Sequence, residues 1–201
     1  MLDNDVQILD LETDLIKRFT FAGTMNSIPL WTHDGQSIVF FSDRGSKFGL
    51  WQKKATFTDE AKLVFPESDI NLWPISFSYD GRILFGGALR RGTDFDLWDY
   101  TLGQTNVGPR FILERSVNEL WPALSPDGRW LVYHSDGQLY VKRYDEEGTI
   151  QQLTMEGGGK PRWSKKGDRI YYSNLDAIWS IEMTVEGEAM SPGTPDFVVK
   201  E

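Results

Sequence analysis

The sequence predicts an all-β fold built from repeated four-stranded antiparallel units. A short turn motif ending in glycine occurs four times in the 201 residues, and its glycines lie 46, 47 and 39 residues apart, at Gly35, Gly81, Gly128 and Gly167. Each motif is followed by a segment rich in β-branched and aromatic residues, which strands prefer. No segment has helical periodicity. A period of about 40–50 residues is typical of the blades of a β-propeller.

Each motif predicts a hairpin turn. A hydroxyl residue stands three positions before every glycine, at Thr32, Ser78, Ser125 and Ser164. A hydroxyl at the first position and glycine at the fourth suit a type I turn closed by a left-handed residue. Pro126 fits the second position of its turn. The second copy has one extra residue between Pro74 and Gly81, which predicts a β-bulge.

Each hydroxyl follows a bulky apolar residue, which we expect to fill the space between neighbouring blades. These four residues are Trp31, Phe77, Leu124 and Trp163.

Three further strands are expected after each turn motif. The second strands are predicted at Ser37–Ser42, Arg82–Phe85, Trp130–Ser135 and Arg169–Ser173. The third strands are marked by Leu50-Trp51, Leu97-Trp98, Leu139-Tyr140 and Ile178-Trp179. The fourth strands are predicted at Ala61–Phe65, Arg110–Leu113, Ile150–Thr154 and Asp196–Val199.

The N-terminal segment matches half of the same template. Val6–Leu11 resembles a third strand and Ile16–Thr20 a fourth. We therefore predict one propeller domain over residues 1–201, with a half blade at 1–22 and full blades at about 23–66, 67–114, 115–155 and 156–201. Half a blade leaves strand edges exposed, so we expect an open or incompletely closed ring that self-associates, and a homodimer is the expected assembly. The alternatives are a five-bladed ring closed with one two-stranded blade, and a chain that is part of a longer protein.

The repeat resembles a known family. The segments Ser125-Pro-Asp-Gly-Arg-Trp-Leu-Val-Tyr133 and Ile38-Val-Phe-Phe-Ser-Asp-Arg-Gly45 are similar to the TolB-like, WD-related β-propeller repeat of bacteria. The resemblance covers about Val6 to Val199. It implies a propeller that binds other proteins.

Composition excludes several classes of function. The formal net charge of −9 disfavours nucleic acid as a partner. With no Cys and two His, disulfides and thiolate or multi-histidine metal sites are not expected, and we predict no cofactor. No apolar run approaches the length of a membrane span. Because the first residues lack the features of a signal peptide, we expect a cytoplasmic location for the chain as encoded, and a periplasmic one if it belongs to a longer exported protein.

The sequence predicts no catalytic constellation. There is no Gly-x-Ser-x-Gly motif, His33 lies in a surface turn, and His134 is expected to be a hydrogen-bonded strand residue. Two carboxylate pairs remain as candidates, Glu67 with Asp69 and Asp94 with Asp96. The alternative to a non-catalytic propeller is therefore small-molecule or glycan binding or hydrolysis in the central channel by such carboxylates. Two close carboxylates with raised pKa in a cleft would favour it.

One face of the disc is the predicted binding surface. The connections between blades and the loops between second and third strands share this face, and Trp and Arg are typical anchors of interfaces. A protein or peptide partner is expected there. The candidate residues are Arg44, Asn71, Trp73, Arg90, Arg91, Asn118, Trp121 and Lys160. For each a structural role is the alternative, namely turn formation for Asn, packing between blades for Trp and surface ion pairs for Arg.

Overall fold

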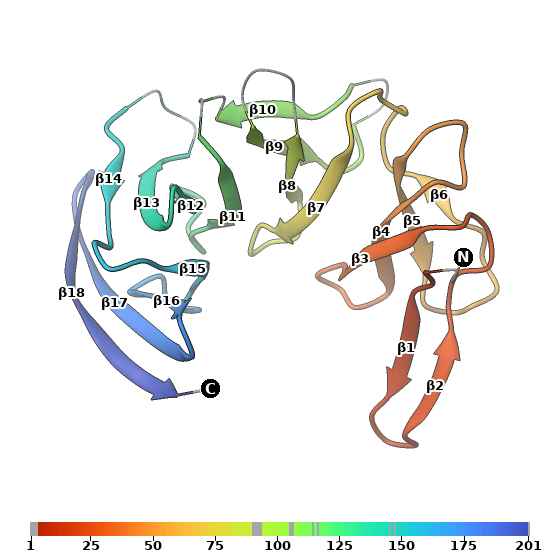
Figure 1. Ribbon diagram of the computed structural model, residues 1–201, viewed down its shortest axis with the longest axis horizontal. Helices are drawn as coiled ribbons and strands as arrows, with labels where there is room; N and C mark the ends of the chain where they lie inside the picture. Colours follow the sequence, from red (N-terminus) through yellow and green to blue (C-terminus); the bar gives the residue numbers. More distant parts are fainter. Residues whose placement is uncertain are drawn as a thin grey trace.

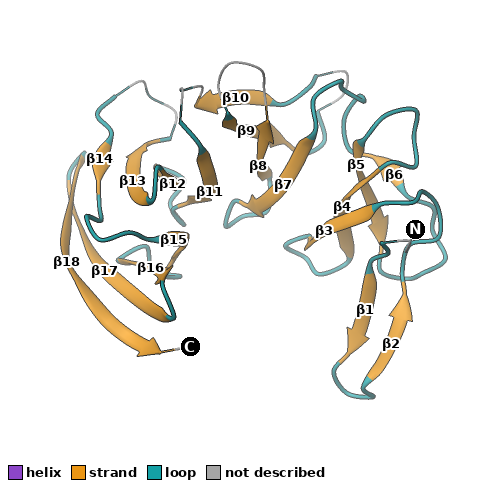
Figure 2. Ribbon diagram, in the orientation of Figure 1, coloured by secondary structure: helices purple, strands orange, loops and turns teal. Residues whose placement is uncertain are grey.

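The computed structural model describes residues 4–89, 94–104, 107–113, 115, 117–144, 146 and 148–200. Within these residues the chain is all strand, turn and loop, without a helix (Figure 2). It forms one two-stranded and four four-stranded antiparallel sheets, each following the chain order of its strands. The chain is thus a β-propeller of four full blades and an N-terminal half blade, as the sequence predicts.

The strands run in chain order through the blades. The half blade contains β1 (Gln7–Asp10) and β2 (Leu15–Arg18). Blade A contains β3 (Asn26–Trp31), β4 (Ser37–Ser42), β5 (Gly49–Lys54) and β6 (Lys62–Leu63). Blade B contains β7 (Leu72–Phe77), β8 (Ile83–Leu89), β9 (Phe95–Thr101) and β10 (Arg110–Leu113).

Blades C and D complete the chain. Blade C contains β11 (Glu119–Leu124), β12 (Trp130–Ser135), β13 (Gln138–Arg143) and β14 (Gln151–Gln152). Blade D contains β15 (Gly159–Trp163), β16 (Arg169–Asn174), β17 (Ala177–Glu186) and β18 (Ala189–Lys200). The fourth strands differ most from expectation, because β6 and β14 have two residues each whereas β18 has twelve.

The blades form an open arc (Figure 1). The half blade lies at one end of the arc and blade D at the other, while β3, β7, β11 and β15 line its inner side. Within the described residues β1 pairs along its length with β2 alone, so its other edge is open. The expectation of an unclosed ring agrees with this arrangement.

The four turns have the predicted geometry. In each, the glycine N–H donates to the carbonyl of the hydroxyl residue three positions earlier, at 2.9–3.0 Å. The glycine φ angles are positive, between 66° and 76°. The predicted bulge of blade B is confirmed as a register shift between Pro74 and Ser76.

Polar clasps repeat between third and fourth strands and support the assignment of β1 and β2. Thr20 Oγ1 accepts a hydrogen bond from Val6 N at 3.0 Å and donates to Asp5 Oδ1 at 2.8 Å. In blade C, Thr154 Oγ1 likewise accepts from Leu139 N at 2.9 Å and lies 3.0 Å from Gln138 Oε1. The half blade therefore consists of the third and fourth strands of the repeat.

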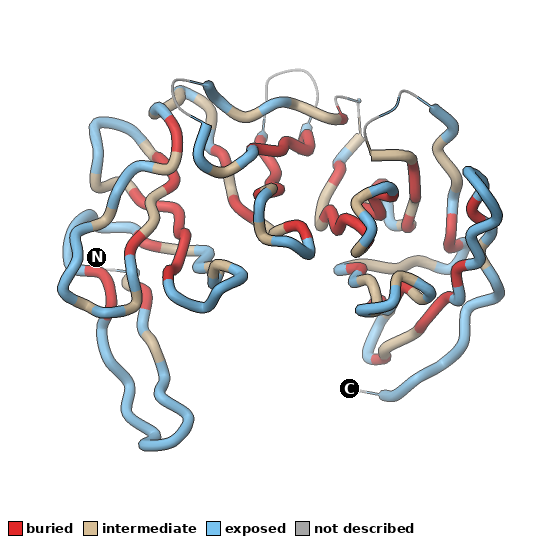
Figure 3. The backbone as a smooth tube through the Cα atoms, turned by 180° about the vertical axis from the view of Figure 1, so that it is seen from behind, coloured by how far each residue is buried: buried red, intermediate tan, exposed pale blue. Residues whose placement is uncertain are grey.

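Apolar side chains fill the spaces between facing sheets. Figure 3 shows that the buried stretches of the chain lie inside the blades, whereas the β1–β2 hairpin and the outer strand β18 are mostly exposed. Val39 and Leu50 of blade A pack with the Leu84 and Trp98 side chains of blade B. Val132 and Leu139 of blade C pack in the same way against blade D. Each blade is thus stabilised mainly by its neighbours in the chain, because burial of apolar area is the dominant stabilising contribution.

The interpretation of Trp31 as a filler between blades was wrong, since its side chain is 50% exposed. Trp163, at the same position of blade D, donates from Nε1 to Ala123 O on the first strand of the preceding blade, at 3.1 Å. The blade before Trp31 is the half blade, which consists of β1 and β2 in the described part of the chain. Trp31 therefore lacks the neighbour that partly buries Trp163.

Candidate functional site

The predicted binding residues lie on the face of the arc that contains the connections from one blade to the next, here called the junction face. Arg90 and Arg91 lie outside the described residues. The other six candidates start a first strand, precede one or follow β4: Arg44, Asn71, Trp73, Asn118, Trp121 and Lys160.

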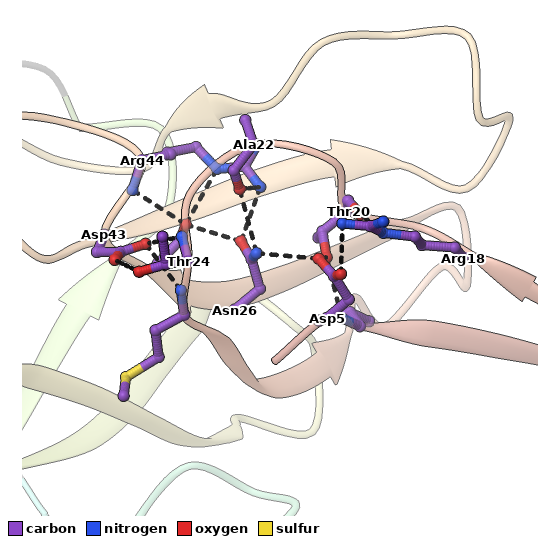
Figure 4. A network of polar contacts seen from close by, with 11 residues as sticks. Asp5, Arg18, Thr20, Ala22, Thr24, Asn26, Asp43 and Arg44 are labelled. Atoms are coloured by element: carbon purple, nitrogen blue, oxygen red, sulfur yellow. Dashed lines mark hydrogen bonds and ion pairs between the residues drawn. The ribbon is translucent and has the colours of Figure 1, made fainter. Parts of the chain in front are cut away.

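Arg44 is held in place by blade A and the segment that precedes it (Figure 4). Its Nη2 donates to Asn26 Oδ1 at 2.9 Å, and its Nε donates to Ser42 Oγ at 3.1 Å. The guanidinium also lies 4.7 Å from the centre of the Phe40 ring. Burial lowers the pKa of Arg44, against the opposing charges of Asp43 and Asp5. Arg44 is therefore a structural residue of this junction rather than a free anchor.

The same polar network connects the half blade to blade A. Asn26 Nδ2 donates to Asp5 Oδ1 at 3.2 Å, and Asp5 forms an ion pair with Arg18 at 2.5 Å. On the other side, Asp43 accepts hydrogen bonds from Thr24 N at 2.8 Å and Met25 N at 2.9 Å. Figure 4 shows the two sets of contacts side by side, one around Asn26 and one around Asp43. Asn26 is consequently buried within β3.

Trp73 and Asn118 both contact Phe95 of blade B. Trp73 is half-buried, and its ring centre lies 5.1 Å from that of Phe95 and 6.4 Å from that of Phe41 in blade A. Asn118 Oδ1 accepts a hydrogen bond from Phe95 N at 3.3 Å, although Asn118 itself is exposed. Asn71 is exposed just before β7. Asn71 and Asn118 thus each directly precede a first strand, whereas Asn26 is the first residue of β3.

Trp121 and Lys160 form a second group at the junction of blades C and D. The Trp121 ring is half-buried and meets the His134 ring in an edge contact, with centres 5.0 Å apart. Burial lowers the pKa of His134. Trp121 also packs against Gly159, directly before exposed Lys160. Lys160 has no ion-pair partner among the described residues.

Trp121 and Lys160 share an unusual backbone position. Their φ angles are 52° and 50°, and each precedes a proline in the first strand of its blade. The register of both strands shifts there, after Leu120 and after Gly159. Ile28, which precedes Pro29 in blade A, has the same left-handed conformation, with a φ of 53° and a register shift after Ser27. This uncommon backbone conformation is therefore a feature of the repeat rather than of the junction face.

Glu119 is the residue of this face that spacing alone did not single out. It stands six positions before the turn hydroxyl of its blade, as Asn26 does in blade A. Glu119 is fully buried, and neither of its carboxylate oxygens has a hydrogen-bond partner among the described residues. Burial raises the pKa of Glu119 to about 7; Arg115, 4.0 Å away, opposes this, and the charge of Asp96 adds to it.

The pair Asp96 and Glu119 therefore replaces Asp94 and Asp96 as the candidate carboxylates for ligand binding or hydrolysis. Asp96 is also fully buried, on β9 of blade B, so the two acids belong to adjacent blades. Asp94 is exposed, at a left-handed φ of 48°. The sequence shows only that Glu119 has the same spacing from its turn as Asn26, and its interaction with Asp96 is a tertiary property.

Glu67 and Asp69 serve the loop between β4 and β5. Ser46 Oγ donates to Glu67 at 2.5 Å, which holds the pKa of that carboxyl below its usual range, and Lys47 forms an ion pair with Asp69 at 2.7 Å. A carboxylate held in its charged form is poorly suited to act as a general acid. Across the described part of the chain, no group of three His, Asp or Glu side chains could hold a metal ion.

Comparison with known proteins supports the fold. No protein-family profile matches the chain. An uncharacterized protein of Agrobacterium fabrum, Atu1656, is 24% identical over 158 residues, which is 71% of this chain and 52% of that protein. The chain thus spans about half the length of this curated relative.

Solved structures of TolB have the same fold. TolB from Acinetobacter baumannii matches 94% of this chain and 48% of its own, with a TM-score of 0.64 and 18% identity. A putative TolB from Agrobacterium tumefaciens matches 92% of this chain and 71% of its own, with a TM-score of 0.67 and 17% identity. The chain has a TolB-like propeller fold.

Matches with other functions show that this likeness concerns the fold alone. The nidogen–laminin complex has a TM-score of 0.64 at 12% identity over 89% of this chain and 67% of its own. A prolyl endopeptidase has a TM-score of 0.59 at 15% identity over 92% of this chain and 32% of its own. A search for helices that are long and apolar enough to cross a membrane finds none among the described residues.

Proposed function

We propose that this protein is a non-catalytic binding propeller whose junction face holds a protein or peptide partner. One observation carries the proposal: Trp73 and Trp121 are only partly buried on first strands of adjacent blades, next to exposed Asn71, Asn118 and Lys160. Partly exposed Trp beside polar residues that can form new hydrogen bonds is typical of interface anchors. TolB and nidogen structures share the fold and supply an analogy only.

The experiment compares two charge reversals on blade D. Lys160→Glu changes the junction face, while Lys166→Glu makes the same change in the turn at the opposite end of the blade. Each variant and the wild type is used as bait in a lysate of the source organism, and every captured protein is then purified and its affinity measured. We expect a partner that binds wild type and Lys166→Glu equally and Lys160→Glu at least about tenfold more weakly. Equal affinity for Lys160→Glu, or binding lost equally in both variants, would refute the proposed face.

The junction of Asp96 and Glu119 favours a second candidate function, ligand binding or hydrolysis by carboxylates. The raised pKa of Glu119 is a feature of catalytic acids. Against this candidate, Glu119 is fully buried, and it is not a lining residue of any of five main cavities formed by the described residues. Hydrolysis of a panel of chromogenic glycosides that disappears in Glu119→Gln would favour the second function over the first.

The open ends of the arc support association of two copies. The edge of β1 is unpaired, and the apolar side chains of the half blade are exposed, with Leu9 at 50%, Ile16 at 65% and Leu11 at 85%. Blade D exposes Phe197 and Val199 on its long outer strand. Unpaired edges with apolar side chains are sites of strand pairing between chains.

Light scattering on a sizing column tests this association. We expect a mass of about twice 23.0 kDa for the wild type and a return to 23.0 kDa when Leu9 and Ile16 are both changed to Glu. Lys62→Glu on outer strand β6 serves as the control that keeps the dimer. A wild type of 23.0 kDa at every concentration would refute the association without affecting the binding face.

A further inference from the structure

A groove lies on the opposite face of the arc, which contains the turns between the first and second strands, and it is separate from the junction face. It has a cavity volume of about 430 Å³ and is lined by first-strand and turn residues of all four full blades. Volumes of this size are typical of small-molecule sites. No Asp or Glu is among its described lining residues, although the whole chain has a net charge of −9.

Aromatic side chains form much of the lining. Trp31 is 50% exposed and Tyr79 is 51% exposed, on blades A and B. Trp163 of blade D is fixed by the hydrogen bond from its Nε1 to Ala123 O. Exposed aromatic faces at fixed positions are platforms on which a flat ring can stack.

Two cations of blade D complete the groove. Arg162 donates from Nη1 to Pro161 O at 2.9 Å, and neither it nor Lys165 forms an ion pair with any described residue. Arg162 and Lys165 are both exposed. The nearby turn carboxylates have partners of their own, as Asp80 does in Ser78 and Arg82. The two cations are therefore available to an anion from outside.

The groove is preformed by contacts between turns. His33 of blade A lies so close to Gly81 of blade B that a Cβ at Gly81 would be 2.4 Å from the His33 Cβ. A Cβ at Gly167 of blade D would lie 3.4 Å from Pro126 Cδ of blade C, so these two turns are also neighbours. Adjacent turns thus support each other in pairs, and a rigid site loses less entropy when it binds a ligand.

We propose that this groove binds a small ligand in which a flat aromatic ring carries an anionic group. The ring stacks on Trp31 or Tyr79, and the anion pairs with Arg162 and Lys165. Arginine is well suited to carboxylate and phosphate groups because its planar donors match their oxygens. Nucleoside monophosphates and aromatic carboxylates share this chemistry. The site is independent of the junction face and of any protein partner there.

Titration calorimetry on the full chain tests the proposal with two pairs of probes. AMP is compared with adenosine, and indole-3-acetate with indole, while inorganic phosphate tests the anion alone. We expect at least one ring-bearing anion to bind with a dissociation constant of about 1 mM or lower. Its neutral counterpart and phosphate should each bind about tenfold more weakly. Binding of AMP would identify the anionic group as a phosphate, and binding of indole-3-acetate would identify it as a carboxylate.

Variants then locate the site. Arg162→Gln and Lys165→Gln should each weaken binding, by about tenfold for Arg162, and Tyr79→Ala or Trp31→Ala by about fivefold or more. Lys62→Gln, the control, makes the same charge change on outer strand β6 and should bind as wild type does. Thermal unfolding checks that each variant is folded. If no ring-bearing anion binds at 1 mM, or if affinity is unchanged in both Gln variants of blade D, the proposal is wrong.

Discussion

Replacing Glu119 with Gln should stabilise the protein at alkaline pH and have much less effect in acid. The folded-state pKa of about 7 lies above the ordinary value of 4.5. Between these values the folded chain binds more protons than the unfolded chain, so the free energy of unfolding falls as pH rises. The raised pKa of Glu119 contributes about 3 kcal/mol to the free energy of unfolding. This contribution is fully present below pH 4.5 and is lost above pH 7.

Gln keeps the shape of the side chain but has no proton to lose. The stability gained by Glu119→Gln over wild type should therefore grow by about 2–3 kcal/mol between pH 5 and pH 8. For a chain of this size that growth corresponds to roughly 5–10 °C in melting temperature.

Urea unfolding followed by Trp fluorescence at both pH values measures this difference. Glu60→Gln, at an exposed residue of the loop before β6, is the matched control and should stay within about 0.5 kcal/mol of wild type at both. The reasoning fails if the gain from Glu119→Gln is the same at pH 5 and pH 8, because a purely steric effect would not depend on protonation.

Three further changes test the fold. Gly128→Val should cost roughly 1–3 kcal/mol of stability, because φ is 76° there, although a Cβ would meet no atom within 4 Å. Gly108→Val, at a glycine whose φ is not positive, is the control. Equal melting temperatures of the two variants would contradict the turn geometry. Tyr144→Phe removes the hydroxyl that donates to Asp99 Oδ2 at 2.7 Å and should cost roughly 1–2 kcal/mol in denaturant unfolding, whereas an unchanged midpoint would show that Arg110 alone suffices. Thr20→Val should expose the half blade to limited proteolysis before the other blades, since it breaks the bonds to Val6 and Asp5; simultaneous cleavage of all blades would argue against an independent clasp.

The repeat carried most of the information about the fold, because each turn depends on residues close together in sequence. Strands β4, β12 and β10 have the predicted bounds, and β1 and β2 were recognised from local pattern alone. Outer strands were harder to place because their pairing depends on the neighbouring strand more than on their own residues, as the two-residue β14 shows.

The candidate site was less predictable, because burial and pairing across blades are tertiary properties. Arg44 has the residue type of an interface anchor, yet Asn26 and Ser42 already occupy its donors. Glu119 became noteworthy only once Asp96 of the adjacent blade was placed near it. The exposure of Trp31 depends on the preceding blade, which has only two strands among the described residues, and the residues around Trp31 give no sign of this.

An open arc has a mechanical consequence that a closed ring lacks. Blades A, B and C each pack against two neighbours, whereas the half blade and blade D each pack against one. The chain therefore resembles a linear array, in which stability is a sum of units and nearest-neighbour interfaces. Opening begins at the termini and proceeds inwards, so amide hydrogens of β1 and β18 should exchange with solvent first and those of β8 and β12 last. The middle of the molecule keeps its structure while its two ends remain free to adapt.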